Sequence, residues 1–316
     1  MERNATDLSL RTPPSFRLAH LQAGCGVMKC QIGAAASCYA VRQNCGIFMH
    51  SLGPRTMKLP FLNHTAQRDL RKPAPTSIPK LDTLQVAMQY RGARMGGDFF
   101  DFIEVEPSRL VFLMMDVAGK RDEAMHIAAA VQDKFRENVP VLFAGDEVNE
   151  SQAAADLNIV INHAVLEAAE GVRCAPAFLA SFDENLGTLT YVNSGHTSAL
   201  IRDAEGTTEL KANGVPLGLF SHAVTDAQLC VLQPGASLLL ASKGLIESKK
   251  AFSKEYGFKR LASVVREAKF STAAELCAQV LGDVEKYIHN ADPDNDVTTV
   301  ALMRASAVQS AVAAGR

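Results

Sequence analysis

Gly96-Gly97-Asp98-Phe99-Phe100-Asp101 opens one apolar run of β type, and Asp116-Val117-Ala118-Gly119-Lys120 closes the next. The two runs, at residues 100–105 and 110–115, are separated by a short turn around Pro107, as in a pair of adjacent antiparallel strands. In such a pair, the start of the first strand and the end of the second lie at the same rim of the sheet. We therefore expect Asp98 and Asp116 to lie close together, beside glycines that let the backbone and a cation approach closely.

The chain around this pair continues with β-type patterns. Alternating apolar residues from Leu84 to Tyr90 predict a strand, which we expect to form one antiparallel meander with the pair. Further short strands are predicted at residues 178–182, 187–193, 198–202, 229–232, 237–241 and 297–303.

Helical spacing occurs in two separate pairs of segments, at residues 122–138 and 151–170 and at about 257–268 and 271–290. Thr272 and Glu275 have the spacing of a capping box at the start of the last helix. Runs of strands that are interrupted by helix pairs favour an α+β fold with antiparallel sheets over a doubly wound parallel sheet.

The two ends of the chain differ from this middle part. Residues 1–56 carry four of the seven cysteines but no sustained period, so we expect a disordered leader, and their cysteine spacing is not typical of zinc sites. Residues 57–80 are predicted to be a Pro-rich linker, because three prolines between positions 71 and 79 exclude a helix. Residues 81–304 then form the folded domain, and residues 305–316 form a flexible tail.

Composition excludes several classes of function. The chain has 316 residues, of which 47% are apolar, and a net charge of −2, which gives no field for gathering nucleic acid. No apolar run has the length of a bilayer span, so no membrane segment is expected. Cys174, Cys230 and Cys277 lie far apart in periodic segments, as reduced core thiols do in cytoplasmic proteins.

Six short motifs occur in the order and spacing of a known family. They are Gly-Gly-Asp-Phe-Phe-Asp (96–101), Asp-Val-Ala-Gly-Lys (116–120), Tyr-Val-Asn-Ser-Gly-His (191–196), Gly-Val-Pro-Leu-Gly-Leu-Phe (214–220), Leu-Gln-Pro-Gly (232–235) and Asn-Asp-Val-Thr (295–298). With these motifs the sequence resembles the metal-dependent PPM serine/threonine phosphatases, in the bacterial SpoIIE/RsbU branch, over about residues 81–304. The resemblance implies an α-β-β-α sandwich of two antiparallel sheets flanked by helix pairs, with a two-metal site at one rim.

The resemblance also implies a chemistry and a set of residues. In the family, manganese (Mn) or magnesium (Mg) ions held by carboxylates activate a water that attacks a phosphoserine or phosphothreonine ester. By resemblance, the metal residues are Asp98, Asp116, Asp296 and the carbonyl of Val117, and the catalytic residues are Asp98, Asp116 and Lys243. Substrate contacts are expected from Lys243, Gly119 and Asn295.

Two ligand positions of the family are substituted in this sequence. The family's Thr-Asp-Gly appears as Ser242-Lys243-Gly244, and its closing Asp-Asp appears as Asn295-Asp296. The three remaining carboxylates and the Lys243 ammonium leave a formal charge of −2, which balances one divalent cation. We therefore expect one Mn or Mg ion rather than two, since Lys243 repels a second cation.

Three interpretations follow from these substitutions. The first is a working phosphatase that uses one metal, with Lys243 as a fixed cation at the substrate phosphate. The second is a pseudophosphatase that keeps phosphoprotein recognition but hydrolyses slowly or not at all. The third is a site rebuilt locally with Asp292 or Asp294.

Other candidate residues fit structural roles better. His196 follows a glycine in a turn and is expected to frame a loop rather than to act as a general acid. Ser194 lacks the strand-turn-helix setting of a nucleophile elbow. The resemblance implies a phosphorylated protein as the partner, such as an anti-sigma-factor antagonist in a partner-switching pathway, and a cytoplasmic location.

Overall fold

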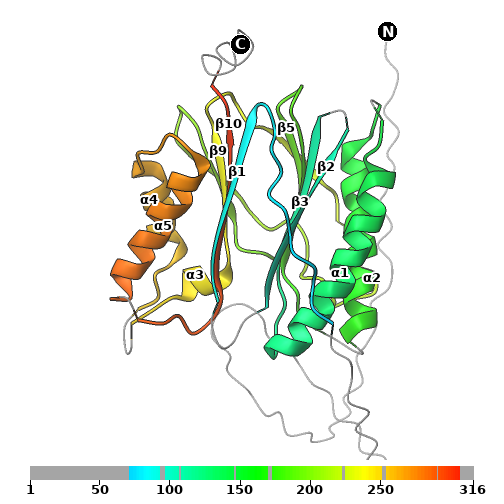
Figure 1. The fold of residues 1–316 in the computed structure, drawn as a ribbon, viewed down its shortest axis with the longest axis horizontal. Helices are drawn as coiled ribbons and strands as arrows, with labels where there is room; N and C mark the ends of the chain where they lie inside the picture. The colour runs from blue at the N-terminus through cyan, green and yellow to red at the C-terminus, as the bar shows by residue number, and fades with distance from the viewer. Residues whose placement is uncertain are drawn as a thin grey trace, which may run out of the picture. The chain divides into compact units, whose positions relative to one another are not determined.

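The computed structural model describes residues 71–92, 97–106, 108–145, 147–169, 173–222, 225–250, 254–289 and 291–306. In these residues two five-stranded antiparallel sheets pack face to face, and each carries a pair of helices on its outer side (Figure 1). The predicted α+β class and the α-β-β-α sandwich are confirmed. The predicted leader at residues 1–56, residues 57–70 of the predicted linker and residues 307–316 of the predicted tail 305–316 lie outside the described residues.

The first sheet, called the β3 sheet, contains the two strands of the aspartate motifs. Its strand order is β2-β3-β4-β5-β8. The strands are β2 (Asp98–Val105), β3 (Arg109–Asp116), β4 (Ala177–Asp183), β5 (Thr188–Ser194) and β8 (Gln228–Val231). Strand β3 is covered on both faces, and this explains why residues 110–115 are an uninterrupted apolar run rather than an alternating one.

The second sheet, called the β10 sheet, joins the two ends of the folded region. Its order is β1-β10-β9-β6-β7, with strands β1 (Leu84–Arg91), β10 (Val297–Arg304), β9 (Ser237–Ala241), β6 (Ala199–Arg202) and β7 (Thr207–Leu210). Because β1 pairs with β10 over its whole length, the prediction that β1 forms a meander with β2 and β3 is wrong. Alternation predicts a strand and its buried face, but not the partner of that strand.

The helices lie in two pairs, as predicted. α1 (Arg121–Leu142) and α2 (Glu150–Ala169) cover the β3 sheet, whereas α4 (Phe258–Glu267) and α5 (Ala273–Tyr287) cover the β10 sheet (Figure 1). Thr272 caps α5 by accepting a hydrogen bond from the Glu275 backbone at 3.2 Å, which confirms the predicted helix start. A short helix that was not predicted, α3 (Lys243–Glu247), follows β9.

Three apolar layers hold these elements together. Side chains on alternate positions of β3 divide between two layers: Val111, Leu113 and Met115 pack against α1 and α2, and Leu110, Phe112 and Met114 pack between the sheets. The third layer lies between the β10 sheet and α4 and α5. The rim site therefore rests on strands whose positions are fixed from both faces.

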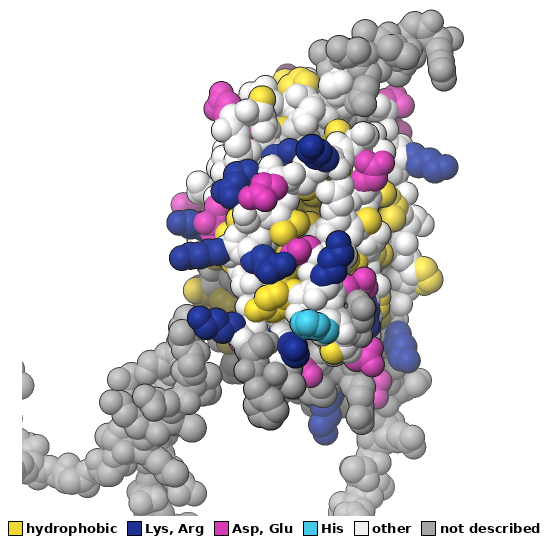
Figure 2. Space-filling view, turned by 90° about the vertical axis from the view of Figure 1, so that its left-hand side faces the viewer, with side chains coloured by type: hydrophobic (Ala, Val, Ile, Leu, Met, Phe, Trp, Pro, Cys, Tyr) yellow, Lys and Arg dark blue, Asp and Glu magenta, His cyan; other side chains and the backbone are white. Residues whose placement is uncertain are grey.

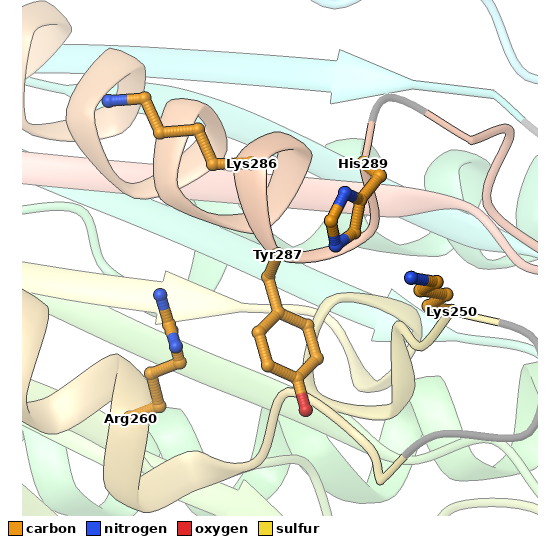
Figure 3. Close-up of a pocket in the computed structure, with 5 residues that line it drawn as sticks. All are labelled: Lys250, Arg260, Lys286, Tyr287 and His289. Atoms are coloured by element: carbon orange, nitrogen blue, oxygen red, sulfur yellow. The ribbon is translucent and has the colours of Figure 1, made fainter.

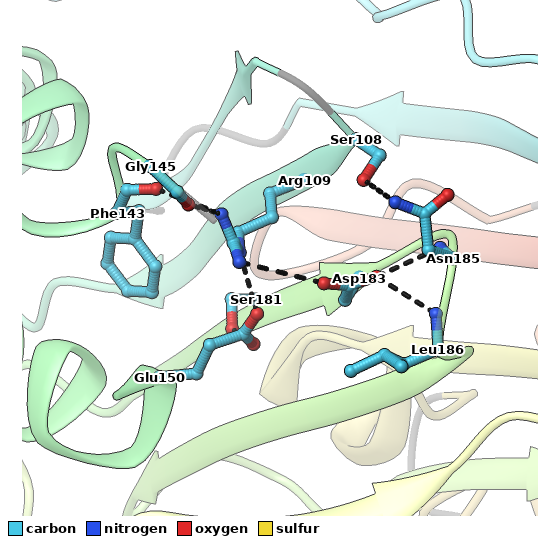
Figure 4. Close-up of polar contacts among 9 residues, drawn as sticks. All are labelled: Ser108, Arg109, Phe143, Gly145, Glu150, Ser181, Asp183, Asn185 and Leu186. Atoms are coloured by element: carbon cyan, nitrogen blue, oxygen red, sulfur yellow. Dashed lines mark hydrogen bonds and ion pairs between the residues drawn. The ribbon is translucent and has the colours of Figure 1, made fainter. Parts of the chain in front are cut away.

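A buried ion network holds the end of α1 and the start of α2 against the β3 sheet (Figure 4). The Arg109 side chain is 6% exposed, and its Nε donates to Glu150 at 2.8 Å. The same guanidinium donates to the carbonyl of Gly145 at 2.6 Å and lies 3.7 Å from Asp183. Such a network is costly to break, because the loss of one partner leaves a buried charge without compensation.

Residues 71–80 form neither helix nor strand, as the prolines predict, but they are not a loose linker. Gln132 of α1 exchanges two hydrogen bonds with the backbone of Ala74, at 2.6 and 3.0 Å. The hydroxyl of Thr76 donates to Asp101 at 2.8 Å, and Arg136 pairs with the same carboxylate at 2.7 Å. Segment 71–80 is thus part of the folded structure, beside β2 and α1.

Candidate active site

Asp98 and Asp116 are direct cross-strand neighbours at one rim of the sheet, and the sequence predicted this shared rim but not the register. Asp98 is the first residue of β2, and Asp116 is the last residue of β3. Gly97 precedes this pair because the backbone leaves no room for a side chain: a Cβ atom there would lie 2.2 Å from the carbonyl oxygen of Val117. The Val117 carbonyl therefore lies beside the two carboxylates.

The β10 sheet contributes the other wall of the site. Thr298 of β10 donates from its hydroxyl to Asp98 at 2.6 Å. Ser242, between β9 and α3, accepts from the backbone of Thr298 at 3.0 Å and donates to the carbonyl of Asp296 at 3.2 Å. Thr298 and Ser242 had not been singled out as site residues, although both lie in or beside motifs of the resemblance.

Asp296 is buried and bound to a cation of the chain itself. Its side chain is 1% exposed, and Oδ1 lies 2.5 Å from Nη2 of Arg121, the first residue of α1. The Arg121 guanidinium also donates to the hydroxyl of Tyr90 at 3.2 Å. Sequence reasoning missed Arg121, because a single arginine in a charged helix start carries no local signal.

The two substituted positions lie in different surroundings. Lys243 begins α3 with a 60% exposed side chain, 3.4 Å from Glu247, and its charge reaches Asp116. Asn295 is exposed and lines a cavity of about 140 Å³, with Gly244, Glu247, Ser248, Lys249, Glu255 and Asp294. Lys243 thus lies near the aspartate pair, whereas Asn295 faces a separate cavity on the α3 side.

The remaining candidates are also placed by the structure. Asp292 forms an ion pair with Arg91 at 3.0 Å, and its side chain is almost fully exposed. This ion pair lies outside the rim. Gly119 has a φ of 134° and lies against Arg173, which is bound to Glu123. His196 is buried, and burial lowers its pKa to about 4, so a neutral ring contacts Thr197, as expected for a residue that frames a loop.

The carboxylates of the site carry charge that the protein compensates only in part. Burial, and then the charge of Asp116, raise the pKa of Asp98 to about 8. Burial also raises the pKa of Asp116; Lys243 opposes this shift, and the charges of Asp296 and Glu247 add to it. Two carboxylates that resist ionisation side by side form a position where a cation would be stabilising.

Few oxygen donors lie together at the rim. The described residues contain no group of three or more His, Cys, Asp or Glu side chains placed to hold a metal ion together. Asp98, Asp116 and the carbonyl of Val117 are the donors that lie together. With all three carboxylates counted as ionised and Arg121 included, three carboxylates and two cations leave a formal charge of −1 around the rim, one unit less negative than the sequence indicated.

A mostly apolar cavity of about 280 Å³ adjoins Asp98. It lies where β1, β2, α1 and segment 71–80 meet, and its lining residues are Pro73, Ala74, Thr76, Met88, Tyr90, Asp98, Phe99, Phe100 and Met125. The aspartate pair is therefore reached beside a surface that suits an apolar side chain.

No helix in the described part of the chain is long and apolar enough to cross a membrane.

Comparison with known proteins identifies a family. The family model of Stage II sporulation protein E (SpoIIE) matches residues 106–305, which include every candidate site residue except Asp98. The curated protein IcfG from Synechocystis sp. is 23% identical over 250 residues, which cover 73% of this chain. The chain spans only 39% of the length of IcfG.

Two solved structures share the fold. The RsbU and RsbW domains of Rv1364c from Mycobacterium tuberculosis align with a TM-score of 0.58 at 22% identity, over 72% of this chain and 62% of that chain. The PP2C phosphatase domain of SpoIIE from Bacillus subtilis, with a fragment of its regulatory domain, aligns with a TM-score of 0.58 at 15% identity. That alignment covers 71% of this chain and 64% of that chain.

Proposed function

The chain belongs to the SpoIIE family, and we propose that it is a PP2C-type protein phosphatase domain that hydrolyses phosphoserine or phosphothreonine in a protein. Phosphatases of this type generally use manganese or magnesium ions. The proposal is supported above all by the direct pairing of Asp98 and Asp116 at the rim, where both carboxylates have a raised pKa. We propose that one such ion binds there.

A bound ion would supply an activated water and would neutralise charge on the phosphate. The chain's own residues do the rest. Thr298 donates a hydrogen bond to Oδ2 of Asp98. This bond fixes the orientation of the carboxylate and therefore the position of its other oxygen, Oδ1. The exposed ammonium of Lys243, within electrostatic reach of Asp116, contacts a phosphate oxygen and lowers the free energy of the charge that develops in the transition state. Gly119 and Asn295 are the further substrate contacts in this proposal.

The substrate in this proposal is a phosphorylated regulatory protein. The related structure of Rv1364c contains an RsbW domain next to an RsbU domain. Such neighbours belong to partner-switching systems, in which an anti-sigma-factor antagonist is the phosphoprotein, and such a system would place this chain in the cytoplasm. The chain covers less than two thirds of either relative, so its partner is proposed from the fold and the site alone.

One observation favours a second function, that of a pseudophosphatase which binds phosphoproteins. Arg121 already neutralises Asp296, and Lys243 lies near Asp116, so the chain supplies fixed cations where the family uses a second metal. Fixed cations attract a phosphate group but activate no water. In this case the domain binds its phosphorylated partner without hydrolysing the phosphate ester.

Phosphate release from a phosphoserine peptide decides between the two. The full chain is assayed with manganese, beside Asp116→Ala and the matched variant Asp156→Ala, which removes an aspartate of α2 outside the site. A phosphatase should turn over at about 1 per second or faster, lose at least ~100-fold with Asp116→Ala, and keep its rate with Asp156→Ala. Equal rates in wild type and Asp116→Ala would instead establish the pseudophosphatase.

The substituted positions give a second arm to this experiment. In a pseudophosphatase, Lys243→Asp together with Asn295→Asp should produce manganese-dependent activity, and each single change should produce much less. In a working enzyme, Lys243→Ala should remove most of an activity that is already present.

A further inference from the structure

The apolar cavity of about 280 Å³ beside Asp98, called the edge cavity here, lies between the edge strands of the two sheets. β1 ends the β10 sheet, β2 ends the β3 sheet, and residues of both strands line the cavity. Met88 of β1 and Phe100 of β2 pack against the apolar layer between the sheets but are only partly buried. The apolar layer is therefore incompletely covered at the edge that adjoins Asp98.

The polar groups in the lining already have partners within the protein. The Thr76 hydroxyl donates to Asp101 at 2.8 Å, and the Tyr90 hydroxyl accepts from Arg121 at 3.2 Å. Among the described lining residues, Asp98 is the one acidic or basic residue. A charged guest would lose its hydration here without gaining a partner, whereas an apolar guest would bury its surface at no such cost.

The size of the edge cavity suits a single amino-acid side chain. Its volume of about 280 Å³ lies below the range of about 300–1,000 Å³ that is typical of pockets for small molecules and cofactors. Met88 and Met125, on opposite walls, have flexible thioether side chains, which adapt to guests of different shape.

The edge cavity is continuous with the candidate active site, because Asp98 belongs to both. A peptide whose phosphorylated residue lies at Asp98 and Asp116 continues past this position in both directions. Residues one to three positions away lie within about 4–11 Å of the phosphorylated residue along an extended chain. The cavity is therefore within reach of a side chain that flanks the phosphorylated residue.

A second cavity, of about 360 Å³ at the C-terminal end of α5, offers no comparable contact. On the face formed by α4 and α5, Lys and Arg side chains lie among Asp and Glu side chains (Figure 2). Figure 3 shows the Lys286 ammonium directed away from Tyr287, and Arg260 and Lys250 on opposite sides of that ring. These basic side chains do not converge on one ligand, so the edge cavity is the better candidate for a substrate contact.

We propose that the edge cavity is a specificity pocket, which binds an apolar side chain of the phosphoprotein substrate within three positions of the phosphorylated residue. The inference rests on the proposed function, because the phosphorylated residue has to lie at Asp98 and Asp116. It applies to a phosphatase and to a pseudophosphatase, since both bind a phosphoprotein at this rim. An apolar contact away from the ester distinguishes proteins that carry the apolar residue from other phosphoproteins.

NMR spectra of ¹³C-labelled methionine methyl groups in the full chain test this pocket directly. The ligands are peptides with a phosphonate analogue of phosphoserine, in which a CH₂ group replaces the ester oxygen, so that magnesium can be present without hydrolysis. Each peptide has Leu at one of the three positions on either side and Ser at the others. At one position, Leu should bind about tenfold more tightly than Ser, and the methyl resonances of Met88 and Met125 should shift with the same dissociation constant.

Two matched variants show whether the cavity causes this preference. Met88→Gln keeps the size of the side chain but makes it polar, and it should reduce the preference for Leu to less than about threefold. Met303→Gln is the control, because Met303 is also partly buried in the β10 sheet but packs against the layer of α4 and α5. It should keep the full preference. Met125→Gln changes the α1 wall instead of β1 and should act like Met88→Gln.

The proposal is overturned if Leu and Ser peptides bind alike at every position, or if Met88→Gln and Met303→Gln have equal effects. Methyl resonances of Met88 and Met125 that no peptide shifts would also overturn it, since another segment or a second copy of the chain would then fill the cavity. Failure of the proposed function gives a different result: peptides with Ser in place of the phosphonate would bind as tightly as the phosphonate peptides, and the premise of this inference would be lost.

Discussion

The negative charge of each carboxylate at the site disfavours ionisation of its neighbours. Asp98 and Asp116 are paired across two strands, and like charges in such a pair destabilise the sheet. The β10 sheet relieves this in part through the hydrogen bond from Thr298. A carboxylate pair that destabilises the fold without a cation, and whose charge a bound cation would neutralise, is typical of a binding site rather than of a purely structural pair.

The stability of the metal-free protein should therefore depend on pH. Because the pKa of Asp98 is raised to about 8, the folded state keeps a proton that the unfolded state gives up near pH 4. The free energy of unfolding should fall as pH rises between these values, by up to about 1.4 kcal/mol per pH unit. Urea unfolding in a chelator, compared with Asp98→Asn, measures this; identical pH slopes would contradict it.

Arg121 should weaken cation binding at the rim, since its charge lies beside Asp296. Replacing it in Arg121→Gln should raise the affinity for manganese about tenfold. Isothermal titration calorimetry measures the change. Arg266→Gln, which removes an exposed arginine of α4 paired with Glu267, is the matched control and should have no effect. An unchanged affinity in Arg121→Gln would show that Arg121 does not act on the site.

Residues within one hairpin could be predicted, whereas residues joined across the fold could not. Asp98 and Asp116 were placed together because local apolar runs define a hairpin and its rim. Arg121 reaches Asp296 across 175 positions, and Thr298 reaches Asp98 across 200. No local pattern encodes such contacts, because they depend on how the two sheets pack.

At the scale of elements, Gly244 determines how closely α3 approaches the strand that follows Asp296. A Cβ atom at Gly244 would lie 2.1 Å from the Asp296 carbonyl, so Gly244→Ala should destabilise the protein by about 2–3 kcal/mol. Gly282 lies within α5 with nothing near its missing Cβ, and Gly282→Ala should stabilise by about 0.5–1 kcal/mol. Urea unfolding measures both; shifts of the same sign would contradict the close approach.

The elements that were predicted are those with a strong period or a long apolar run. The four long helices and the strands of the β3 sheet belong to this class. β7 has one buried residue in four, and α3 has only five residues, so neither carries a period that could be recognised. The prediction that β1 pairs in a meander with β2 and β3 failed for the same reason as the contacts of Arg121 and Thr298 were missed. The strand that pairs with β1 is β10, at the other end of the domain.

At the scale of the molecule, segment 71–80 should matter more than residues 1–56. A chain shortened to residues 57–316 should melt within about 2 °C of the full chain, because in the described part of the chain the fully buried members of the three apolar layers begin at Leu84. Removing residues 1–80 should lower the melting temperature by about 5 °C, since Gln132 and Asp101 lose partners. A large loss in the first chain, or none in the second, would contradict this assignment.

The pairing of β1 with β10 also sets the order in which the protein can be completed during synthesis. The β2, β3, β4 and β5 strands pair with near neighbours, so the β3 sheet and its helices can assemble while the ribosome is still translating the rest. β10 lies between β1 and β9, and it is the last strand to emerge. Until it does, the β10 sheet stays divided and Asp98 lacks Thr298, so the nascent chain acquires its complete rim only after β10 has emerged from the ribosome.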